Sequence, residues 1–329
     1  MNFFKVIRSI EWWEYKLPPL LAIGYATIIK SSNQFLTSLP HLLMLLLSLI
    51  IGAVYVSIIN DITDIKDDLA SGKHNRVAAI RPAFRWVLPA LCLLAGFFFG
   101  YQFYPDLLSV YLYLMPWICF SLYSFPPVRL KNRGKWGVLA DASGSHIFTS
   151  LLMVSSMSYI NSQSVDWYWF TSTGIWALCY GVRGILWHQF YDRDNDIQAG
   201  IKTFAVSVAP NNFKKKEVII LSIELIAIAV MLFNIHQLLP FLALFVYILV
   251  ALSRSYKLKY TAVIIIAPEQ RPYHIIMADF YQVYFPLSLL CVAALSNPYI
   301  LIVLLIHLIL FPMKTIASLK DLRQLISFK

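Results

Sequence analysis

Two short stretches of the sequence place carboxylates directly after long apolar runs. The first, Asn60 to Asp68, reads Asn-Asp-Ile-Thr-Asp-Ile-Lys-Asp-Asp and follows the run from Leu42 to Ile59. On a helix, Asp61, Asp64 and Asp68 are spaced i, i+3 and i+7, so they share one face. Neighbouring carboxylates repel one another unless a cation lies between them, and hard oxygen ligands suit Mg²⁺, which bridges carboxylates to phosphates. The stretch therefore predicts a magnesium site for a diphosphate.

The second stretch, His188 to Asp196, also follows an apolar run and places Asp192 and Asp196 at i and i+4 of one helical face. If the two stretches face each other, their carboxylates together would hold more than one Mg²⁺ around a single diphosphate. The alternative is two solvated, acidic helix ends at a membrane surface. Recurrence of the pattern at the ends of two hydrophobic segments favours the metal site.

The composition restricts the elements that carry these stretches. The chain has 329 residues, of which 59% are hydrophobic and only 13% charged, too apolar for a soluble globule. About 20 apolar residues make one helical span. The segments of that kind are 17 to 36, 40 to 60, 84 to 104, 107 to 125, 138 to 160, 168 to 190, 217 to 236, 238 to 253, 276 to 296 and 298 to 313. The sequence predicts an all-α, polytopic transmembrane helical bundle.

Lysine and arginine placement orients this bundle, because cytoplasmic segments carry the excess of positive charge. Nearly all of these residues fall on one side, whereas Lys30 lies alone on the other and Arg183 lies inside a span. Both chain ends and both acidic motifs are then cytoplasmic, in a multi-pass protein of the cell (inner) membrane. The net charge of +10 fits this topology and contact with anionic membrane lipid, and we expect no nucleic acid partner. Residues 1–329 are one domain, with 1–16 as an amphipathic interfacial lead-in.

Basic residues follow the acidic stretch closely. Lys73 and Arg76 lie in the next loop, and Arg129 and Lys131 come after a Pro-Pro pair that ends a span. These four side chains either bind diphosphate oxygens or anchor the cytoplasmic loops, and their spacing does not decide between the two.

Other polar residues lie within the predicted spans. Asp141, His146 and Arg183 predict one structural ion pair before a catalytic role. Asp279 and Glu224 are similar residues without an assigned partner. The four cysteines have neither the spacing of a metal site nor that of a disulfide framework.

Three segments resemble motifs of the UbiA superfamily of intramembrane prenyltransferases. Asn60-Asp61-x-x-Asp64-x-x-x-Asp68 resembles its NDxxDxxxD signature, and Asp192-x-x-x-Asp196 resembles its second DxxxD motif. The segment Tyr123-Ser-x-Pro-Pro-x-Arg129-Leu-Lys131 is similar to that of members acting on quinone, tocopherol or chlorophyll precursors. The resemblance covers roughly the first two thirds of the chain.

The resemblance implies a bundle of nine spans, against the ten counted above, around a central lipid-accessible cavity. It implies Mg²⁺-dependent transfer of a prenyl group from an allylic prenyl diphosphate to a lipophilic, aromatic or quinone-type acceptor. The implied metal ligands are Asp61, Asp64, Asp68, Asp192 and Asp196. The implied catalytic residues are Asp61, Asp64, Asp192 and Lys131, and the implied substrate-binding residues are Asn60, Lys73, Arg76, Tyr123, Arg129 and His188. A dry cavity would shelter the allylic carbocation from water.

Some features depart from the family pattern, and two other functions stay open. Asn75-Arg76 stands where a Pro-x-Arg-Pro is common, and His188 is either a general base or the partner of a structural hydrogen bond. One alternative is a terpene cyclase on the same scaffold, which needs no acceptor. The other is a cation-coupled transporter, although transporter sites lie near the membrane midplane rather than at its edge.

Overall fold

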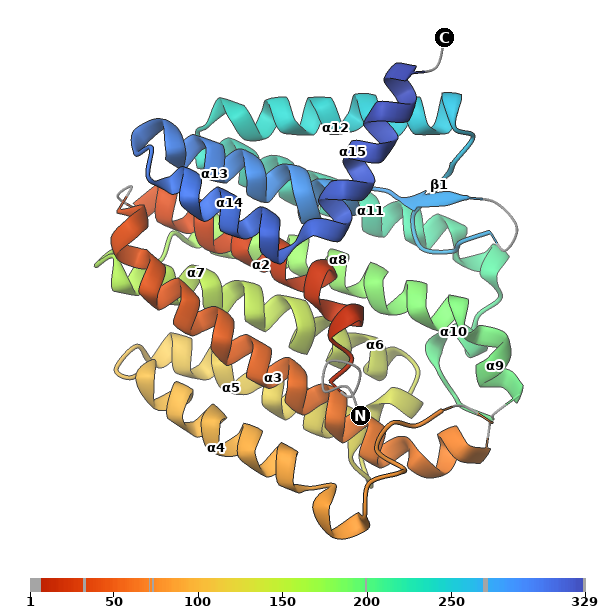
Figure 1. The fold of residues 1–329 in the computed structure, drawn as a ribbon. Coiled ribbons are helices and arrows are strands. Elements are labelled where there is room, and N and C mark those ends of the chain that lie inside the picture. Colours follow the sequence, from red (N-terminus) through yellow and green to blue (C-terminus); the bar gives the residue numbers. More distant parts are fainter. Residues whose placement is uncertain are drawn as a thin grey trace.

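The computed structural model describes residues 7–31, 34–70, 72, 74–198, 200–268 and 272–327, which form a helical bundle (Figure 1). The longer helices are α2 (Ser9–Ser31), α3 (Phe35–Ala70), α4 (Val87–Gln102), α5 (Leu107–Ser124), α7 (Phe148–Ile160), α8 (Trp167–Tyr191), α11 (Pro210–Ile235), α12 (Leu238–Lys257), α13 (Phe285–Ser296), α14 (Ile300–Leu310) and α15 (Pro312–Ser327). The shorter elements are η1 (Pro82–Phe84), η2 (Leu130–Asn132), α6 (Lys135–Ala142), η3 (Ser143–Ile147), α9 (Arg193–Gln198), α10 (Phe204–Ser207), β1 (Thr261–Val263), β2 (Tyr273–Ile275) and η4 (Phe280–Tyr284). Strands β1 and β2 pair in parallel. The all-α prediction is confirmed.

Each of the ten predicted spans overlaps one or more helices of the described residues, but fewer of these helices meet the length and composition expected of a membrane span. Among the described residues six do, namely α3, η1 with α4, α5, α6 through α7, α11 and α12, and the bent pair α14 and α15 would make a seventh. Helix α14 has 11 residues, or roughly 16 Å, about half the thickness of a bilayer core. The chain then bends by 89° into α15. The predicted count of nine or ten spans is therefore not confirmed.

Local signals in the sequence define where several helices begin and end. Asp166 caps the start of α8, because its side chain accepts hydrogen bonds from the backbone N–H groups of Tyr168 and Trp169. Pro210 occupies the first turn of α11, where its missing N–H costs nothing. Gly72, just beyond α3, has a φ of +70°, a left-handed conformation that suits glycine at a helix end.

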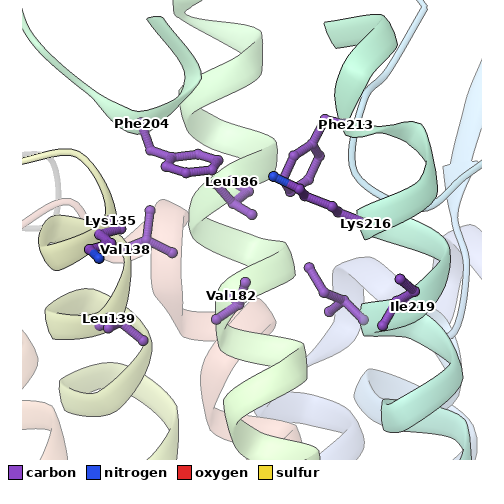
Figure 2. A pocket seen from close by; sticks show the side chains of 10 residues that line it. Lys135, Val138, Leu139, Val182, Leu186, Phe204, Phe213, Lys216 and Ile219 are labelled. Carbon is purple, nitrogen blue, oxygen red and sulfur yellow. The ribbon is translucent and has the colours of Figure 1, made fainter. Parts of the chain in front are cut away.

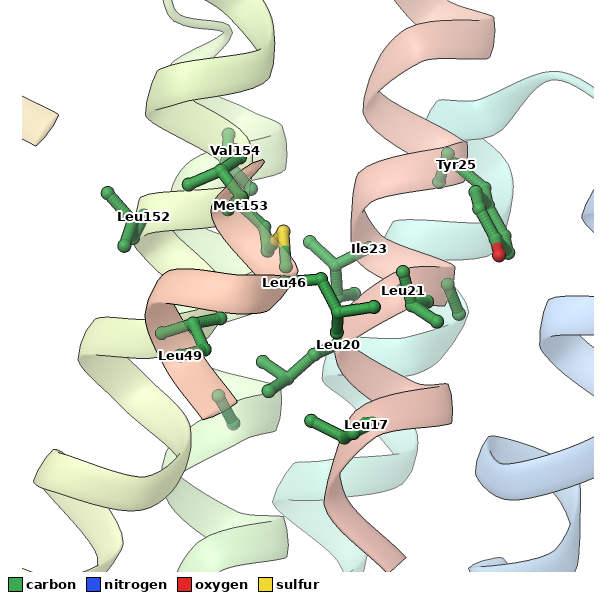
Figure 3. Close-up of a cluster of buried hydrophobic side chains, with 14 of the residues drawn as sticks. Leu17, Leu20, Leu21, Ile23, Tyr25, Leu46, Leu49, Leu152, Met153 and Val154 are labelled. Atoms are coloured by element: carbon green, nitrogen blue, oxygen red, sulfur yellow. The ribbon is translucent and has the colours of Figure 1, made fainter. Parts of the chain in front are cut away.

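Helix α2 lies inside the bundle and packs against α7, α13 and α3. It runs without interruption from Ser9, so the described part of the lead-in continues into the first predicted span. Figure 3 shows apolar side chains of α2, such as Leu20 and Ile23, meeting Leu46 and Leu49 of α3 and Met153 of α7. This contact forms one part of the apolar core.

Helix α8 is the second buried element, packed on α11, α6 and α7. Gly181 permits the close approach to α6, since a Cβ at this position would lie 3.0 Å from His146 and 3.1 Å from Ala142. Two π-helical segments, η3 and η4, also contact this region. His146 of η3 lies with its ring 5.0 Å from that of Tyr180, and Tyr281 of η4 lies 5.0 Å from the same ring.

A buried ion pair joins α8 to α11. Arg183 Nη1 lies 2.5 Å from Glu224 Oε1, and Arg183 Nη2 donates to the Ile276 carbonyl at 2.6 Å. The Tyr281 hydroxyl donates to Glu224 at 2.9 Å. The residue paired with Arg183 is therefore Glu224, while the side chain of Asp141 accepts a hydrogen bond from Ser145.

Helix α15 is held at both ends by charged groups. Both carboxylate oxygens of Glu14, a buried residue of α2, accept backbone N–H groups at the start of α15, from Met313 at 2.9 Å and Lys314 at 2.8 Å. Near its other end, Asp321 pairs with Arg254 of α12 at 2.8 Å. The predicted tenth span is thus replaced by a short helix and a docked, bent continuation.

Candidate functional site

Both acidic stretches lie at one end of the bundle. Helix α3 extends past its apolar run and carries the first stretch on its last turns, while α8 ends next to α9, which carries part of the second. In Figure 1, α9, α10 and β1 lie at this same end of the bundle, on the right. The segment around η2 joins them there, because the backbone of Gly134 forms a parallel bridge with Thr203.

Asp61 is a buried carboxylate at this end, 5% exposed. Its Oδ1 lies 3.5 Å from Arg8 Nη1, and its Oδ2 lies 3.8 Å from Arg76 Nη1. Arg8 directly precedes α2, so the segment before α2 and the loop after α3 both supply cations to this carboxylate. The two guanidinium groups offset part of the cost of burying a negative charge.

Asp64 and Asp67 pair with the basic residues that follow the Pro-Pro sequence. Arg129 Nη2 lies 2.9 Å from Asp64 Oδ1 and 2.8 Å from Asp67 Oδ2, and Lys131 also donates to Asp64. Arg129 has a φ of +39°, a left-handed conformation that is uncommon for a residue with a long side chain. Such strained residues are concentrated at functional sites.

Asn75 links the loop to α3. Its buried amide nitrogen donates to the Asp61 carbonyl at 2.7 Å and to Asp68 Oδ2 at 2.8 Å. Its amide oxygen accepts the N–H groups of Val77 and Ala78, each at 3.0 Å. All the hydrogen-bonding atoms of this side chain are therefore used to hold the loop and the Asp68 carboxylate in one arrangement.

Asn60 and Tyr123 connect α3 to α5. The Asn60 side-chain oxygen accepts a hydrogen bond from the hydroxyl of Ser124. Tyr123 lies within electrostatic reach of three carboxylates, those of Asp141, Asp64 and Asp196. The two stretches are both tied to the segment around η2: Lys131 pairs with Asp64 of the first stretch, while Gly134 bridges to Thr203, which donates to Asp196 of the second.

The second stretch differs from the continuous helix expected from the sequence. Helix α8 ends at Tyr191, Asp192 is its C-terminal cap, and α9 starts at Arg193. One helical hydrogen bond still crosses the break, from the Asp196 N–H to the Asp192 carbonyl at 2.9 Å. Asp196 is buried and its Oδ2 accepts from the Thr203 hydroxyl at 3.1 Å.

The carboxylates of the site suit a divalent cation, although in this structure they pair with arginine and lysine side chains. Carboxylate oxygens are the ligands that Mg²⁺ prefers. Among the described residues, no three His, Cys, Asp or Glu side chains come close enough together to hold one metal ion. Instead the carboxylates of α3 face guanidinium, ammonium and amide groups, so binding a metal here requires these pairs to separate.

The pKa of Lys131 is lowered by its position in the site. Burial lowers its pKa from 10.5, and the neighbouring Arg129 lowers it further, while Asp64 raises it without restoring the ordinary value. Lys131 therefore loses its positive charge at a lower pH than a solvated lysine.

The remaining predicted residues are placed less centrally. His188 is exposed, with its ring 4.8 Å from that of Trp187. Lys73 lies outside the described residues. Arg8, Asp67 and Asn75 were not predicted as site residues. Asp67 stands inside the first stretch and was detectable as a carboxylate, whereas no sequence signal connects Arg8 with carboxylates elsewhere in the chain. Thr203 belongs to the extended segment after Asp196 that resembles the family motif, but its hydrogen bond to Asp196 was not predicted.

Comparison with known proteins identifies relatives of this fold. The profile of the UbiA prenyltransferase family matches residues 20–263. The structure is similar to that of a UbiA homolog from Archaeoglobus fulgidus bound to GPP and Mg²⁺, with a TM-score of 0.55, 16% identity, and coverage of 88% of this chain and 99% of that chain. The homolog bound to DMAPP and Mg²⁺ gives a TM-score of 0.55, 15% identity, and coverage of 89% and 99%. No curated protein matches the sequence. The family match and the apolar helices together identify an integral membrane protein.

Proposed function

The chain belongs to the UbiA prenyltransferase family, and on this premise we propose that it transfers a prenyl group from an allylic prenyl diphosphate to a lipophilic acceptor in the membrane. Residues 1–329 would form one such domain, with the acidic end in the cytoplasm. The related homolog from Archaeoglobus fulgidus binds GPP or DMAPP together with Mg²⁺, which supports a prenyl diphosphate as the donor.

One observation carries the proposal: carboxylates and cations from distant segments are gathered at a single end of an apolar bundle. The carboxylate of Asp64 contacts both Arg129 and Lys131. The carboxylate of Asp61 contacts Arg8 and Arg76. A diphosphate needs both kinds of group, cations for its own oxygens and carboxylates for its counter-ions.

Mg²⁺ would be held by Asp61, Asp64, Asp68, Asp192 and Asp196, and it would stabilise negative charge on the departing diphosphate. The basic side chains would then change partners. Arg129 and Lys131 would turn from Asp64 toward the diphosphate oxygens, and Arg76 would turn toward them from Asp61. Asn60 and Tyr123 would line the space between the two acidic stretches.

The apolar interior beside this end suits the rest of the reaction. An isoprenoid tail would lie among the apolar side chains of the bundle, where water is excluded and an allylic carbocation survives long enough to be captured. Aromatic faces stabilise such a cation through their π-electrons. An aromatic or quinone-type acceptor is electron-rich and would capture it; His188 would lie at the exposed edge of this site.

The test is diphosphate release by the purified protein with Mg²⁺ and allylic diphosphates of several chain lengths, with and without phenolic and quinol acceptors, followed by mass analysis of the lipid product. Acceptor-dependent release together with a prenylated product is the expected result. Asp64→Asn should abolish release, whereas Asp194→Asn should not, because the Asp194 side chain is 79% exposed and pairs only with its neighbour Arg193 among the contacts seen.

Other outcomes would point to other functions. Release of diphosphate with a cyclised hydrocarbon or alcohol and no acceptor would replace the transferase with a terpene cyclase. No release under any condition, combined with cation-dependent uptake into vesicles, would support a transporter instead.

A further inference from the structure

A groove on the outside of the bundle has no carboxylate of the site among its lining residues. Helix α8 forms its floor and packs against both α6 and α11, which form its two walls. The groove has a volume of about 400 Å³. Figure 2 shows Val182 and Leu186 on α8 between Leu139 of α6 and Ile219 of α11, so the wide part is lined by apolar side chains.

Two lysines border one end of this groove. Lys135 stands on the α6 wall and Lys216 on the α11 wall, and both side chains are exposed. In Figure 2 the Lys216 side chain extends from α11 toward α8 and lies beside Phe213. The other lining residues are apolar, and no carboxylate is among them.

We propose that this groove binds an anionic phospholipid of the surrounding membrane. Its acyl chain would lie along Leu139, Val182 and Ile219, and its phosphate would lie between Lys135 and Lys216. The apolar lining suits the acyl chain, and the positive charge of the two lysines suits the anionic phosphate. Lysines near a membrane surface each contribute measurable attraction to anionic lipid.

The lining residues of the groove also favour a phospholipid over the prenyl diphosphate proposed as the donor substrate. A prenyl diphosphate has an apolar tail and a phosphate end too, but its two phosphates carry more charge and are bound with divalent cations held by carboxylates. The surface of the groove is apolar, and two lysines but no carboxylate are among its lining residues, which suits an acyl chain in the groove and a single phosphate diester at its rim. Its wall residues Leu139 and Ile219 are exposed, 41% and 58%, so a lipid reaches it directly from the bilayer.

The basic end of the groove adjoins the second acidic stretch. Phe204 follows Thr203, whose hydroxyl donates to Asp196, and Lys135 follows Gly134, which bridges to Thr203. Substitution of Phe204 would therefore disturb the proposed active site, and the test uses only lysines and the floor of the groove.

Equilibrium binding measured by native mass spectrometry tests the proposal, with the detergent-purified full chain and either phosphatidylglycerol or phosphatidylcholine carrying the same acyl chains. We expect tighter binding of phosphatidylglycerol. Lys135→Ala with Lys216→Ala should weaken it, by about fivefold for each lysine, and leave phosphatidylcholine unchanged. The matched control is Lys214→Ala with Lys215→Ala, which removes the same number of charges next to Lys216 on α11 but none from the lining of the groove.

A second variant tests the apolar part without changing charge. Val182→Trp fills the floor of the groove and should weaken binding of both lipids, while an unchanged elution volume and melting temperature show that the protein is folded. Three results would overturn the proposal. The first is equal binding of the two lipids by the wild type, and the second is an equal loss of phosphatidylglycerol binding in the groove and control lysine variants. The third is displacement of phosphatidylglycerol by geranyl diphosphate both in the wild type and in Asp64→Asn. The last result would mean that the groove takes the prenyl donor.

Discussion

Lys131 and Arg129 both pair with the carboxylate of Asp64. These two cations neutralise the negative charge that a metal ion would otherwise neutralise. Their roles differ because arginine keeps its charge at every accessible pH and lysine does not. The lowered pKa of Lys131 makes the charge of the site depend on pH on the alkaline side.

The first prediction concerns this alkaline dependence. If Lys131 must be protonated to bind the diphosphate, kcat/KM falls as the pH rises through its pKa, which lies below 10.5. Lys131→Arg should shift this fall to higher pH, and Lys131→Met should lower kcat/KM by about tenfold or more, since a charge-assisted hydrogen bond contributes roughly 1.5–3 kcal/mol. The measurement is diphosphate release from pH 7 upward, and identical alkaline limbs for wild type and Lys131→Arg would remove Lys131 from the charge of the site.

Asn75 carries the second prediction, because it fixes the position of Asp68 through a 2.8 Å hydrogen bond. Asn75→Ala should raise the Mg²⁺ concentration needed for half-maximal activity by about tenfold, as partners of metal ligands do. His74→Ala is the control, since His74 is an exposed neighbour. A Mg²⁺ titration of diphosphate release measures the effect. Unchanged Mg²⁺ dependence in Asn75→Ala would show that the amide only shapes the loop.

At the scale of elements, the acidic site depends on the packing of α8, and a buried ion pair fixes α8 against α11. Removing one partner of such a pair leaves the other charge buried and costs about 3–5 kcal/mol, whereas replacing both with apolar residues is close to neutral. Arg183 is 3% exposed and Glu224 is fully buried, so this rule applies to both.

The third prediction follows. Arg183→Met alone should lower the melting temperature in detergent strongly, and Arg183→Met combined with Glu224→Met should recover most of the loss. Thermal unfolding followed by the fluorescence of the many tryptophans measures both variants. A double variant as unstable as the single one would mean that the hydrogen bonds to Ile276 and Tyr281, rather than the ion pair, hold these helices together.

The elements themselves were largely predictable from the sequence, because apolar runs of about 20 residues have few alternatives to a helix. The bend after α14 was not predicted, because the run from 298 to 313 was treated as one apolar segment. Pro312 within that run marks the break, since it starts α15 and cannot continue α14, which ends at Leu310. Glu14 of α2 then holds the start of α15 by accepting the N–H groups of Met313 and Lys314. The break between α8 and α9 at Asp192 was not predictable either. The i, i+4 spacing of Asp192 and Asp196 is compatible with one continuous helix and with two helices that meet at Asp192.

At the scale of the whole molecule, the fold brings together segments that the sequence analysis could only consider one at a time. The i, i+3, i+7 spacing correctly placed the first stretch on one helix, α3. The spacing could not reveal Arg8 at Asp61 or Thr203 at Asp196, because these contacts depend on how whole helices are arranged.

The same limit explains the metal site. The carboxylates were recognisable in the sequence, but in the structure their partners are basic side chains from other segments. The sequence does not specify whether a given carboxylate binds Mg²⁺ or pairs with a basic side chain. Occupation by Mg²⁺ and by basic side chains are alternatives at the same oxygens, and the proposed function requires the protein to exchange one for the other.

The central claim is that both acidic stretches form one site for Mg²⁺ and a prenyl diphosphate. Equilibrium binding of geranyl diphosphate, measured by calorimetry with and without Mg²⁺, tests it most directly in wild type, Asp64→Asn, Asp196→Asn and the control Asp194→Asn. We predict Mg²⁺-dependent binding in wild type and Asp194→Asn, and its loss in both Asp64→Asn and Asp196→Asn. Full Mg²⁺-dependent binding by Asp196→Asn would contradict a shared site, and binding by both variants would contradict the assignment altogether.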